Sequence, residues 1–145
     1  MHFDFAAPET AMLPIAESQE STTRLIVFLT AGDDDDGKRA TLAFSAACAA
    51  RAVGMDSVVF LVGDGLRWAN RPIGESVQLP GLPSLETLVA EFEEDGGEIY
   101  ACSACHGARA EPCDTEGRVM ARRTNVSPAG FASLFSGCGA NCVTF

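Results

Sequence analysis

The segment Cys102-Ser-Ala-Cys105-His106 concentrates the residue types that can do chemistry in this sequence. Two thiols separated by two residues can work as a redox dithiol, in which Cys102 attacks and Cys105 resolves. A thiol at the start of a helix is close to unpaired backbone N–H groups and to the positive end of the helix dipole, which predicts a lowered pKa for Cys102. Nucleophilic sulfur chemistry needs such a thiolate in an exposed crevice, and His106 is a candidate base near it.

Other interpretations of these thiols stay open. The pattern C-x-x-C-H is also the attachment signature of c-type haem, but haem attachment requires export of the chain. A zinc or iron–sulfur site would draw on several cysteines, although their spacing matches no common zinc framework. Its candidate ligands are Cys102, Cys105, Cys113, Cys138 and Cys142, with His106 available. Alternatively Cys102 is buried and unreactive, because free cysteine packs well as a small hydrophobe.

Composition narrows the class of protein. The 145 residues suit one folded domain, and the net charge of -10 argues against nucleic acid or an anionic membrane as a partner. No apolar run approaches the roughly 18 residues of a membrane span, and the first residues lack the basic region of a secretory signal. We therefore expect a cytoplasmic protein with reduced cysteines. Residues 1–22 are predicted to be a flexible extension, and residues 23–145 a single domain.

Apolar patterning predicts strands that alternate with helices. Residues 24–30 and 57–63 are continuous apolar runs of the kind found in buried strands, and residues 38–53 between them form a predicted helix. The other elements predicted are a long loop over 63–83, a helix beginning after Ser84, a strand over 98–102, a short helix opened by Ser127-Pro128-Ala129, and a last strand over 142–145. This alternation indicates an α/β fold with a parallel sheet covered on both faces.

Some predictions about these elements can be tested residue by residue. The helix over 38–53 is expected to bury a stripe of Leu42, Ala46, Ala49 and Val53, and the helix after Ser84 to bury Leu85, Leu88, Val89 and Phe92. Cys48 is assigned to core packing.

Three polar or reactive segments follow predicted strands, where parallel sheets gather their ligands. They are the acidic run Asp33 to Asp36, the loop with Trp68, and Cys102. The acidic run is interpreted as a turn that caps a helix, because it lacks the spaced ligands of a calcium loop. Trp68 either lines a crevice or interface, or plugs its loop. Phosphate-binding loops and the common hydrolase motifs are absent from the sequence.

Two stretches of the sequence resemble the DsrE/DsrF-like family of small sulfur-relay proteins. RLIVFLTAGDDDDGKRATLAFSAACAARAVGMDSVVFLVGDGL resembles the opening β-α-β unit of that family, with its alanine-rich helix and its "GDG" turn. LETLVAEFEEDGGEIYACSAC resembles the next helix and a strand that ends in a cysteine, and CVTF falls where the last strand is expected.

The resemblance implies a three-layer α/β/α fold of the YchN type, with a mainly parallel sheet of about five strands, assembled as homo-trimers or homo-hexamers. It also implies that Cys102 takes a persulfide sulfur from a donor protein and passes it to an acceptor protein, without a cofactor. The extra cysteines depart from the family pattern and leave room for sulfur release by an internal disulfide, with Cys105 as resolving thiol. The leading hypothesis is a cytoplasmic sulfur carrier or sulfurtransferase component. The alternatives are a zinc or iron–sulfur protein and a non-catalytic oligomeric binding protein.

Overall fold

The computed structural model describes residues 23–72, 77–108, 120–136 and 139–145. For residues 71–72, 106–108 and 120–122 it describes the backbone alone. The predicted extension over 1–22 lies outside the described residues, so its flexibility stays a prediction.

Five parallel strands form the central sheet, in the order β6-β4-β2-β1-β7. Their bounds are Arg24–Leu29 for β1, Asp56–Leu61 for β2, Glu98–Cys102 for β4, Val126–Ala129 for β6 and Ala140–Thr144 for β7. Two short strands, β3 (Asn70–Pro72) and β5 (Met120–Arg122), pair antiparallel in a separate ribbon. The expected α/β fold with a mainly parallel sheet of about five strands is confirmed.

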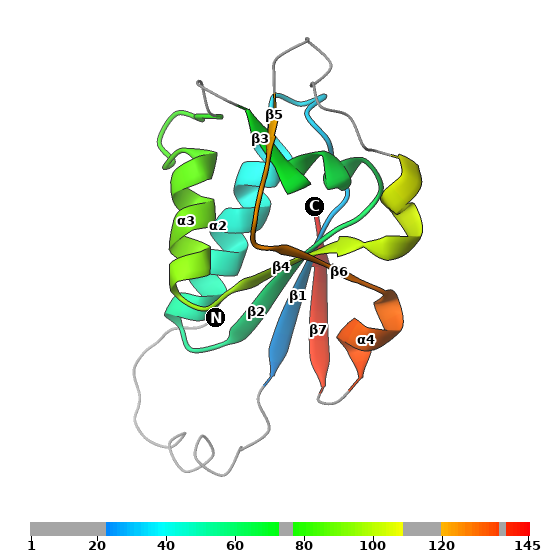
Figure 1. The fold of residues 1–145 in the computed structure, drawn as a ribbon. Coiled ribbons are helices and arrows are strands. Elements are labelled where there is room, and N and C mark those ends of the chain that lie inside the picture. The colour runs from blue at the N-terminus through cyan, green and yellow to red at the C-terminus, as the bar shows by residue number, and fades with distance from the viewer. Residues whose placement is uncertain (1–22, 73–76, 109–119, 137–138) are drawn as a thin grey trace, which may run out of the picture.

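Helices cover both faces of the sheet and complete the expected three layers (Figure 1). The helices α2 (Lys38–Ala52) and α3 (Leu85–Glu94) lie side by side on one face, and the short helix α4 (Phe131–Phe135) lies on the other. Two 3-10 helices, η2 (Gly63–Ala69) and η3 (Ser103–Ala108), follow β2 and β4 directly. Within the described residues, none of the helices is both long enough and apolar enough to cross a lipid bilayer.

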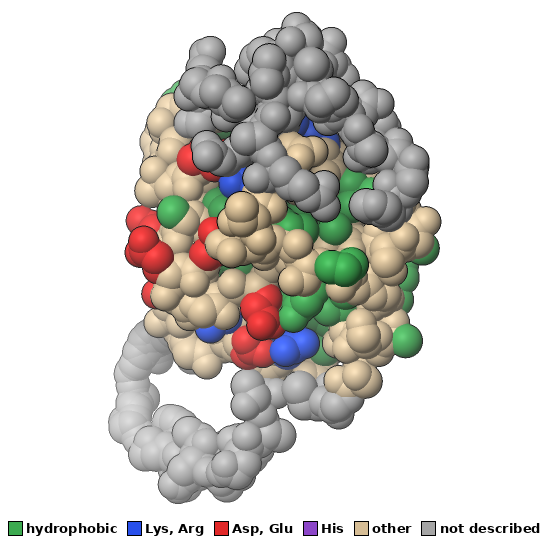
Figure 2. Space-filling model, in the orientation of Figure 1, with side chains coloured by type: hydrophobic (Ala, Val, Ile, Leu, Met, Phe, Trp, Pro, Cys, Tyr) green, Lys and Arg blue, Asp and Glu red, His purple; other side chains and the backbone are tan. Residues whose placement is uncertain are grey.

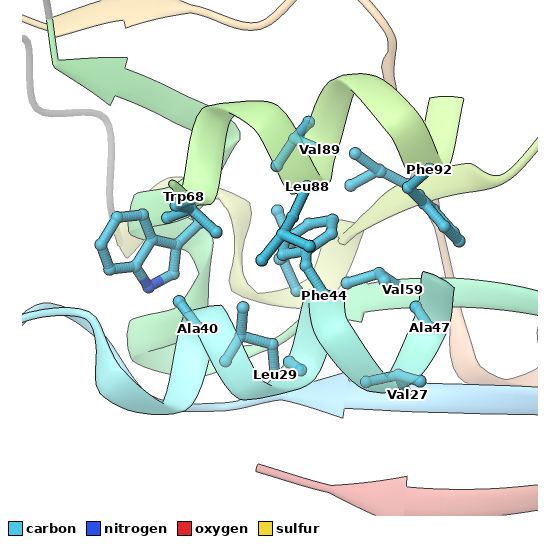
Figure 3. Packing of buried hydrophobic residues seen from close by; sticks show 14 of the residues in the cluster. Val27, Leu29, Ala40, Phe44, Ala47, Val59, Trp68, Leu88, Val89 and Phe92 are labelled. Atoms are coloured by element: carbon cyan, nitrogen blue, oxygen red, sulfur yellow. The ribbon is translucent and has the colours of Figure 1, made fainter. Parts of the chain in front are cut away.

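The main core lies between the sheet and the pair α2 and α3 (Figure 3). The stripe predicted for α3 is confirmed, since Leu85, Leu88, Val89 and Phe92 are all buried. Ser84 caps this helix, and its hydroxyl accepts a hydrogen bond from the Thr87 backbone N–H (3.2 Å).

The stripe predicted for α2 is wrong. Leu42 and Val53 are 46% and 76% exposed, and the buried residues of this helix are Ala40, Thr41, Ala43, Phe44, Ala47 and Ala50. The helix carries alanine on nearly every side, so periodicity could not select a face. Packing selected the face with small side chains, which lets α2 approach the sheet closely, and Phe44 meets the Phe92 ring edge-on at 5.9 Å.

Two other expectations need correction. Residues 63–72 of the predicted loop form η2 and β3 instead. Residues 127–129 were expected to open a helix, but they belong to the edge strand β6, where Pro128 pairs in register with Ala101. An edge strand tolerates proline because one side of it needs no ladder hydrogen bond, and the short helix α4 starts only after Gly130.

A smaller core lies on the α4 face of the sheet. It contains Ile26, Val58, Phe60, Cys102 and Leu134. Phe131 of α4 meets the Phe60 ring edge-on at 5.2 Å, yet Phe131 and Phe135 remain 46% and 47% exposed. Figure 2 shows hydrophobic side chains gathered on the side of the molecule where α4 lies, while acidic side chains gather over α3.

A buried ion pair fastens the segment after β5 to the rest of the fold. Arg123 is only 8% exposed, its Nε donates to the Trp68 carbonyl oxygen (2.8 Å), and its two terminal nitrogens donate to both carboxylate oxygens of Glu86 (2.9 and 2.7 Å). Two parallel hydrogen bonds make this the strong form of an arginine–carboxylate pair. Its partners are far apart in the chain, so no local pattern could reveal it.

The variant Arg123→Met is therefore expected to lower the free energy of unfolding by about 2–3 kcal/mol, because it leaves the Glu86 carboxylate and the Trp68 carbonyl without their donors. Urea unfolding followed by circular dichroism measures the change. Arg39→Met is the matched control, since Arg39 is half-exposed and pairs with Asp34 and Asp35 at the surface, where the cost is below about 1 kcal/mol. Equal unfolding midpoints for the two variants would contradict this account.

Candidate functional site

The carboxyl ends of the strands lie together at one end of the sheet. In Figure 1, η2, η3 and the C-terminus occupy this end, at the top of the view. Cys102 is the last residue of β4, and Ser103 is the first residue of η3. The predicted strand-to-helix junction at Cys102 is thus confirmed.

This junction brings Cys102 and Cys105 together. The Cys105 thiol donates a hydrogen bond to Cys102 Sγ at 3.1 Å. Cys102 also pairs in register with Ala129 of the neighbouring strand β6. The Ser103 hydroxyl donates to the Ala129 carbonyl oxygen (3.3 Å). The two sulfurs are therefore held at the end of the sheet by backbone pairing and by the first turn of η3, at a distance from which they can exchange a proton or form a bond.

The two thiols differ in their access to solvent. Cys102 is 1% exposed and belongs to the small core under α4, whereas Cys105 is partly exposed and packs at the edge of both cores. Of the two environments considered for Cys102, an exposed crevice and a buried position, the described fold has the buried one. It shares this buried cluster with residues distant in sequence, among them Phe60 and Leu134.

Burial also reverses the expected direction of the Cys102 pKa. Desolvation raises the pKa of this thiol, and the side-chain hydrogen bond with Cys105 raises it further. The backbone N–H groups of Cys105 and Ala104 lower the pKa, as predicted for a helix start, but not enough to offset burial and the contact with Cys105. A lowered pKa for Cys102 was thus a wrong prediction, although the local effect behind it exists.

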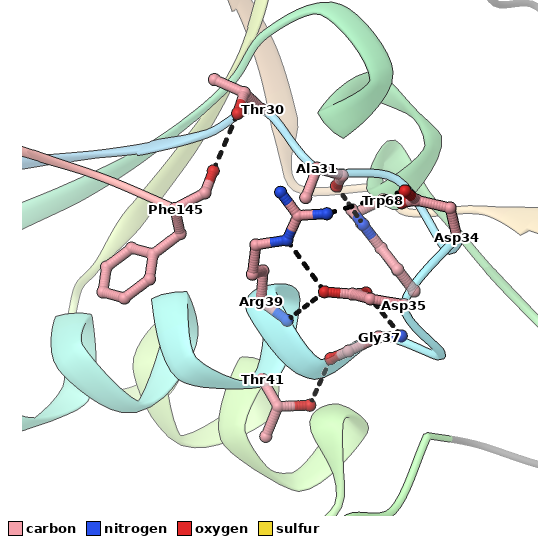
Figure 4. A network of polar contacts seen from close by, with 9 residues as sticks. All are labelled: Thr30, Ala31, Asp34, Asp35, Gly37, Arg39, Thr41, Trp68 and Phe145. Carbon is pink, nitrogen blue, oxygen red and sulfur yellow. Dashed lines mark hydrogen bonds and ion pairs between the residues drawn. The ribbon is translucent and has the colours of Figure 1, made fainter.

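The acidic loop after β1 caps the amino end of α2 (Figure 4). The Asp35 carboxylate accepts from the backbone N–H of Gly37 (3.1 Å) and of Arg39 (3.0 Å). Gly37, at φ 79°, takes the left-handed conformation that lets the chain enter the helix there. Asp34 pairs with Arg39, and Asp33 with Arg67. The interpretation of this run as a capping turn is confirmed.

Trp68 plugs its loop. The indole is 1% exposed, its Nε1 donates to the Ala31 carbonyl oxygen (2.9 Å), and the Arg67 guanidinium lies 4.5 Å from the ring centroid. Through these contacts η2 is tied to the loop after β1. The structure thereby selects one of the two interpretations of this residue, and its function is to hold the carboxyl end of the sheet together.

The structure does not bring the other described cysteines to the pair. Cys48 lies on α2, on the opposite face of the sheet, and its thiol donates to the Leu88 carbonyl oxygen (3.4 Å). Cys142 is exposed on β7, in register with Ile26 and Val58, so it is three strands, or about 14 Å, from β4. Within the described residues, no three potential metal ligands come together. Cys113, Cys138 and the side chain of His106 lie outside them, so the metal-site alternative stays untested.

A surface groove lies away from the thiol pair. An open groove of about 490 Å³ runs beside the amino end of β4 and is lined by Glu93, Gly97, Glu98, Ile99, Tyr100, Thr124, Asn125 and Ser127. Its polar groups include the Tyr100 hydroxyl, which donates to Glu98 (2.7 Å). The groove contains no thiol and is at the opposite end of β4 from Cys102.

The sequence of this chain matches the DsrE/DsrF-like family over residues 24–134. The chain belongs to the DsrE/DsrF-like family. The match includes Cys102 and Cys105 and ends before Cys142. The resemblance to this family, which was inferred from the order of the predicted strands and helices, is confirmed.

Solved structures support the fold of this DsrE/DsrF-like protein. It is similar to the ychN protein from E. coli, with a TM-score of 0.56 and 15% sequence identity over 86% of this chain and 100% of the other. At this identity the likeness shows a common fold and nothing about activity. No curated protein matches the sequence.

Proposed function

We propose that this DsrE/DsrF-like protein is a sulfur-relay protein that carries a sulfane sulfur as a persulfide on the Cys102–Cys105 pair. The observation that carries the proposal is the position of this pair, with its sulfurs 3.1 Å apart at the carboxyl end of β4. The resemblance described above assigns the persulfide to the cysteine that ends this strand. Family membership and position support the same role.

The chemistry requires only thiols. A thiolate of the pair attacks the terminal sulfur of a donor persulfide, the donor leaves as a thiolate, and a persulfide remains on the protein. Delivery can follow two routes. Either an acceptor thiolate attacks the bound terminal sulfur, or the second thiol of the pair attacks the loaded cysteine, forms a disulfide and releases the sulfur as hydrosulfide. The relay needs no cofactor, and this absence is part of the proposal.

The partners in this proposal are a sulfur donor protein and an acceptor protein, both in the cytoplasm. With a net charge of -10, the chain favours partners with basic docking surfaces. Self-association as a trimer or hexamer, implied by the resemblance, is consistent with the half-exposed rings of Phe131 and Phe135 on α4. Localisation and oligomeric state stay predictions.

Incubation of the reduced protein with a small persulfide donor, followed by intact-mass and peptide mass spectrometry, tests the proposal. We expect one added sulfur atom, or the disulfide that follows it, on the 102–105 peptide. The double variant Cys102→Ser/Cys105→Ser should take up none there. Cys142→Ser is the matched control, because it removes an exposed thiol distant from the pair and should leave uptake unchanged.

Sulfur found solely on Cys142, or no uptake at all, would contradict the proposal. Metal analysis of the same sample decides the alternative, because a stoichiometric zinc or iron content lost together with the cysteines would favour a metal site.

A further inference from the structure

The two thiols of the pair have different surroundings, and this difference assigns them different tasks. We propose that Cys105 is the thiol that accepts the sulfur, and that Cys102 is the buried resolving thiol that releases it as hydrosulfide. This order is the reverse of the one that the sequence suggested. The inference rests on the proposed sulfur-relay function and specifies how its site works.

Access is the first argument. A donor persulfide must bring its terminal sulfur into bonding contact with the attacking sulfur, in line with the bond that breaks. Cys102 is 1% exposed and belongs to the buried cluster that includes Leu134 of α4, so a donor reaches it only if this part of the fold opens. Cys105 lies in the first turn of η3 and is partly exposed. The donor therefore meets Cys105 first.

Packing is the second argument. A persulfide on Cys102 would add a sulfur atom to a cluster whose members Ile26, Val58 and Phe60 are fully buried. Extra volume in a packed core forces neighbouring side chains to move and is destabilising. Cys105 is only partly buried at the edge of the cores, so a sulfur added there does not have to fit wholly inside packed side chains. The buried position is better suited to a thiol that forms a bond to its neighbour than to one that carries a group.

The reaction consists of two balanced steps. In the first, the Cys105 thiolate attacks the terminal sulfur of the donor, a new S–S bond forms, and the donor leaves as a thiolate. In the second, Cys102 gives its proton to solvent, and the thiolate attacks Cys105 Sγ, 3.1 Å away in the unloaded pair. The bond between Cys105 Sγ and the sulfane sulfur breaks, and hydrosulfide leaves with the electron pair. Two thiols are oxidised to a disulfide, and the sulfane sulfur is reduced to sulfide.

The second step makes the relay dependent on a reductant. The disulfide form has no thiol at this site, so it accepts no further sulfur until a dithiol reductant restores the pair by thiol–disulfide exchange. The protein would then deliver sulfur as sulfide once per reduction.

The experiment adds glutathione persulfide to the reduced protein and follows released sulfide, free thiols and mass. For the native sequence we expect about one sulfide per chain and loss of the two thiols of the pair. Cys102→Ala should accumulate a persulfide on Cys105 and release sulfide at least about tenfold more slowly, because the resolving nucleophile is missing. Cys105→Ser should take up sulfur at the pair at least about tenfold more slowly, because Cys102, the remaining thiol of the pair, is buried.

Alanine is chosen at position 102 because it keeps the buried cluster apolar, and Cys102→Ser is measured alongside it. Circular dichroism verifies that each variant is folded. Full-rate uptake by Cys105→Ser, with the persulfide on Cys102, would overturn the assigned order and leave the proposed relay function intact. A stable persulfide on Cys105 of the native sequence, without sulfide release, would overturn the resolving role of Cys102. No uptake by any of these proteins would overturn the proposed function itself.

Discussion

In the folded, reduced protein, Cys105 is expected to react with iodoacetamide roughly tenfold or more faster than Cys102. The reagent reaches the partly exposed Cys105 directly, whereas Cys102, at 1% exposure, requires local opening of the α4 face. The raised pKa of Cys102 adds to the difference, because the thiolate is the reactive form. Timed alkylation followed by peptide mass spectrometry measures both rates in one sample.

The same measurement has a predictable dependence on pH. A raised pKa means that Cys102 is protonated at neutral pH, so its labelling should still be rising at alkaline pH values where an ordinary thiol has levelled off. Cys142 is the internal reference, since it is exposed on β7 and should be labelled early. If Cys102 were labelled as fast as Cys142 at neutral pH, both its burial and the assigned order of the two thiols would be wrong.

The substitution Gly65→Ala is expected to lower the free energy of unfolding by about 3 kcal/mol. A Cβ at this position would lie 1.8 Å from the Leu29 carbonyl oxygen and 2.7 Å from the Leu29 carbonyl carbon. Both are backbone atoms of β1, so no side chain can rotate to make room. The first turn of η2 would have to move away from the end of β1, and the hydrogen bond from Val62 N–H to the Leu29 carbonyl (3.0 Å) would be strained.

Urea unfolding of this variant, with circular dichroism as readout, tests the prediction. Gly139→Ala is the matched control, because a Cβ there meets no atom within 4 Å. The expected displacement should also disturb Trp68, the buried indole three residues later. The fluorescence spectrum of Trp68 should therefore change in folded Gly65→Ala and not in folded Gly139→Ala. A Gly65→Ala variant as stable as the control would show that η2 does not approach β1 this closely.

Much of the fold could be predicted because its signals are local. The apolar runs of β1 and β2, the spacing of the buried residues of α3 and the cap at Ser84 each depend on neighbours within a few positions. The junction that joins Cys102 to Cys105 is local as well, since a strand end and one helical turn bring the two sulfurs within 3.1 Å. The order of these elements also sufficed to indicate the family.

Other features depend on residues that meet only in the folded chain. The buried face of α2 was decided by close packing against the sheet and α3, because its alanines are compatible with either side. Pro128 was taken for a helix start, but pairing with β4 draws it into an edge strand. The bidentate contact between Arg123 and Glu86 has no sequence signal for the same reason.

The chemistry of the candidate site likewise has a part that follows from local sequence and a part that depends on tertiary contacts. The sequence alone determined that Cys102 ends a strand, that Cys105 follows one turn later, and that backbone N–H groups favour the thiolate of Cys102. Only the tertiary structure decided that Cys102 is buried and that its pKa rises, because Phe60 and Leu134 come from other parts of the chain. Burial raises the pKa of Cys102 against the local effect of the backbone N–H groups. Because burial also limits access to Cys102, the accepting role proposed above belongs to the partly exposed Cys105.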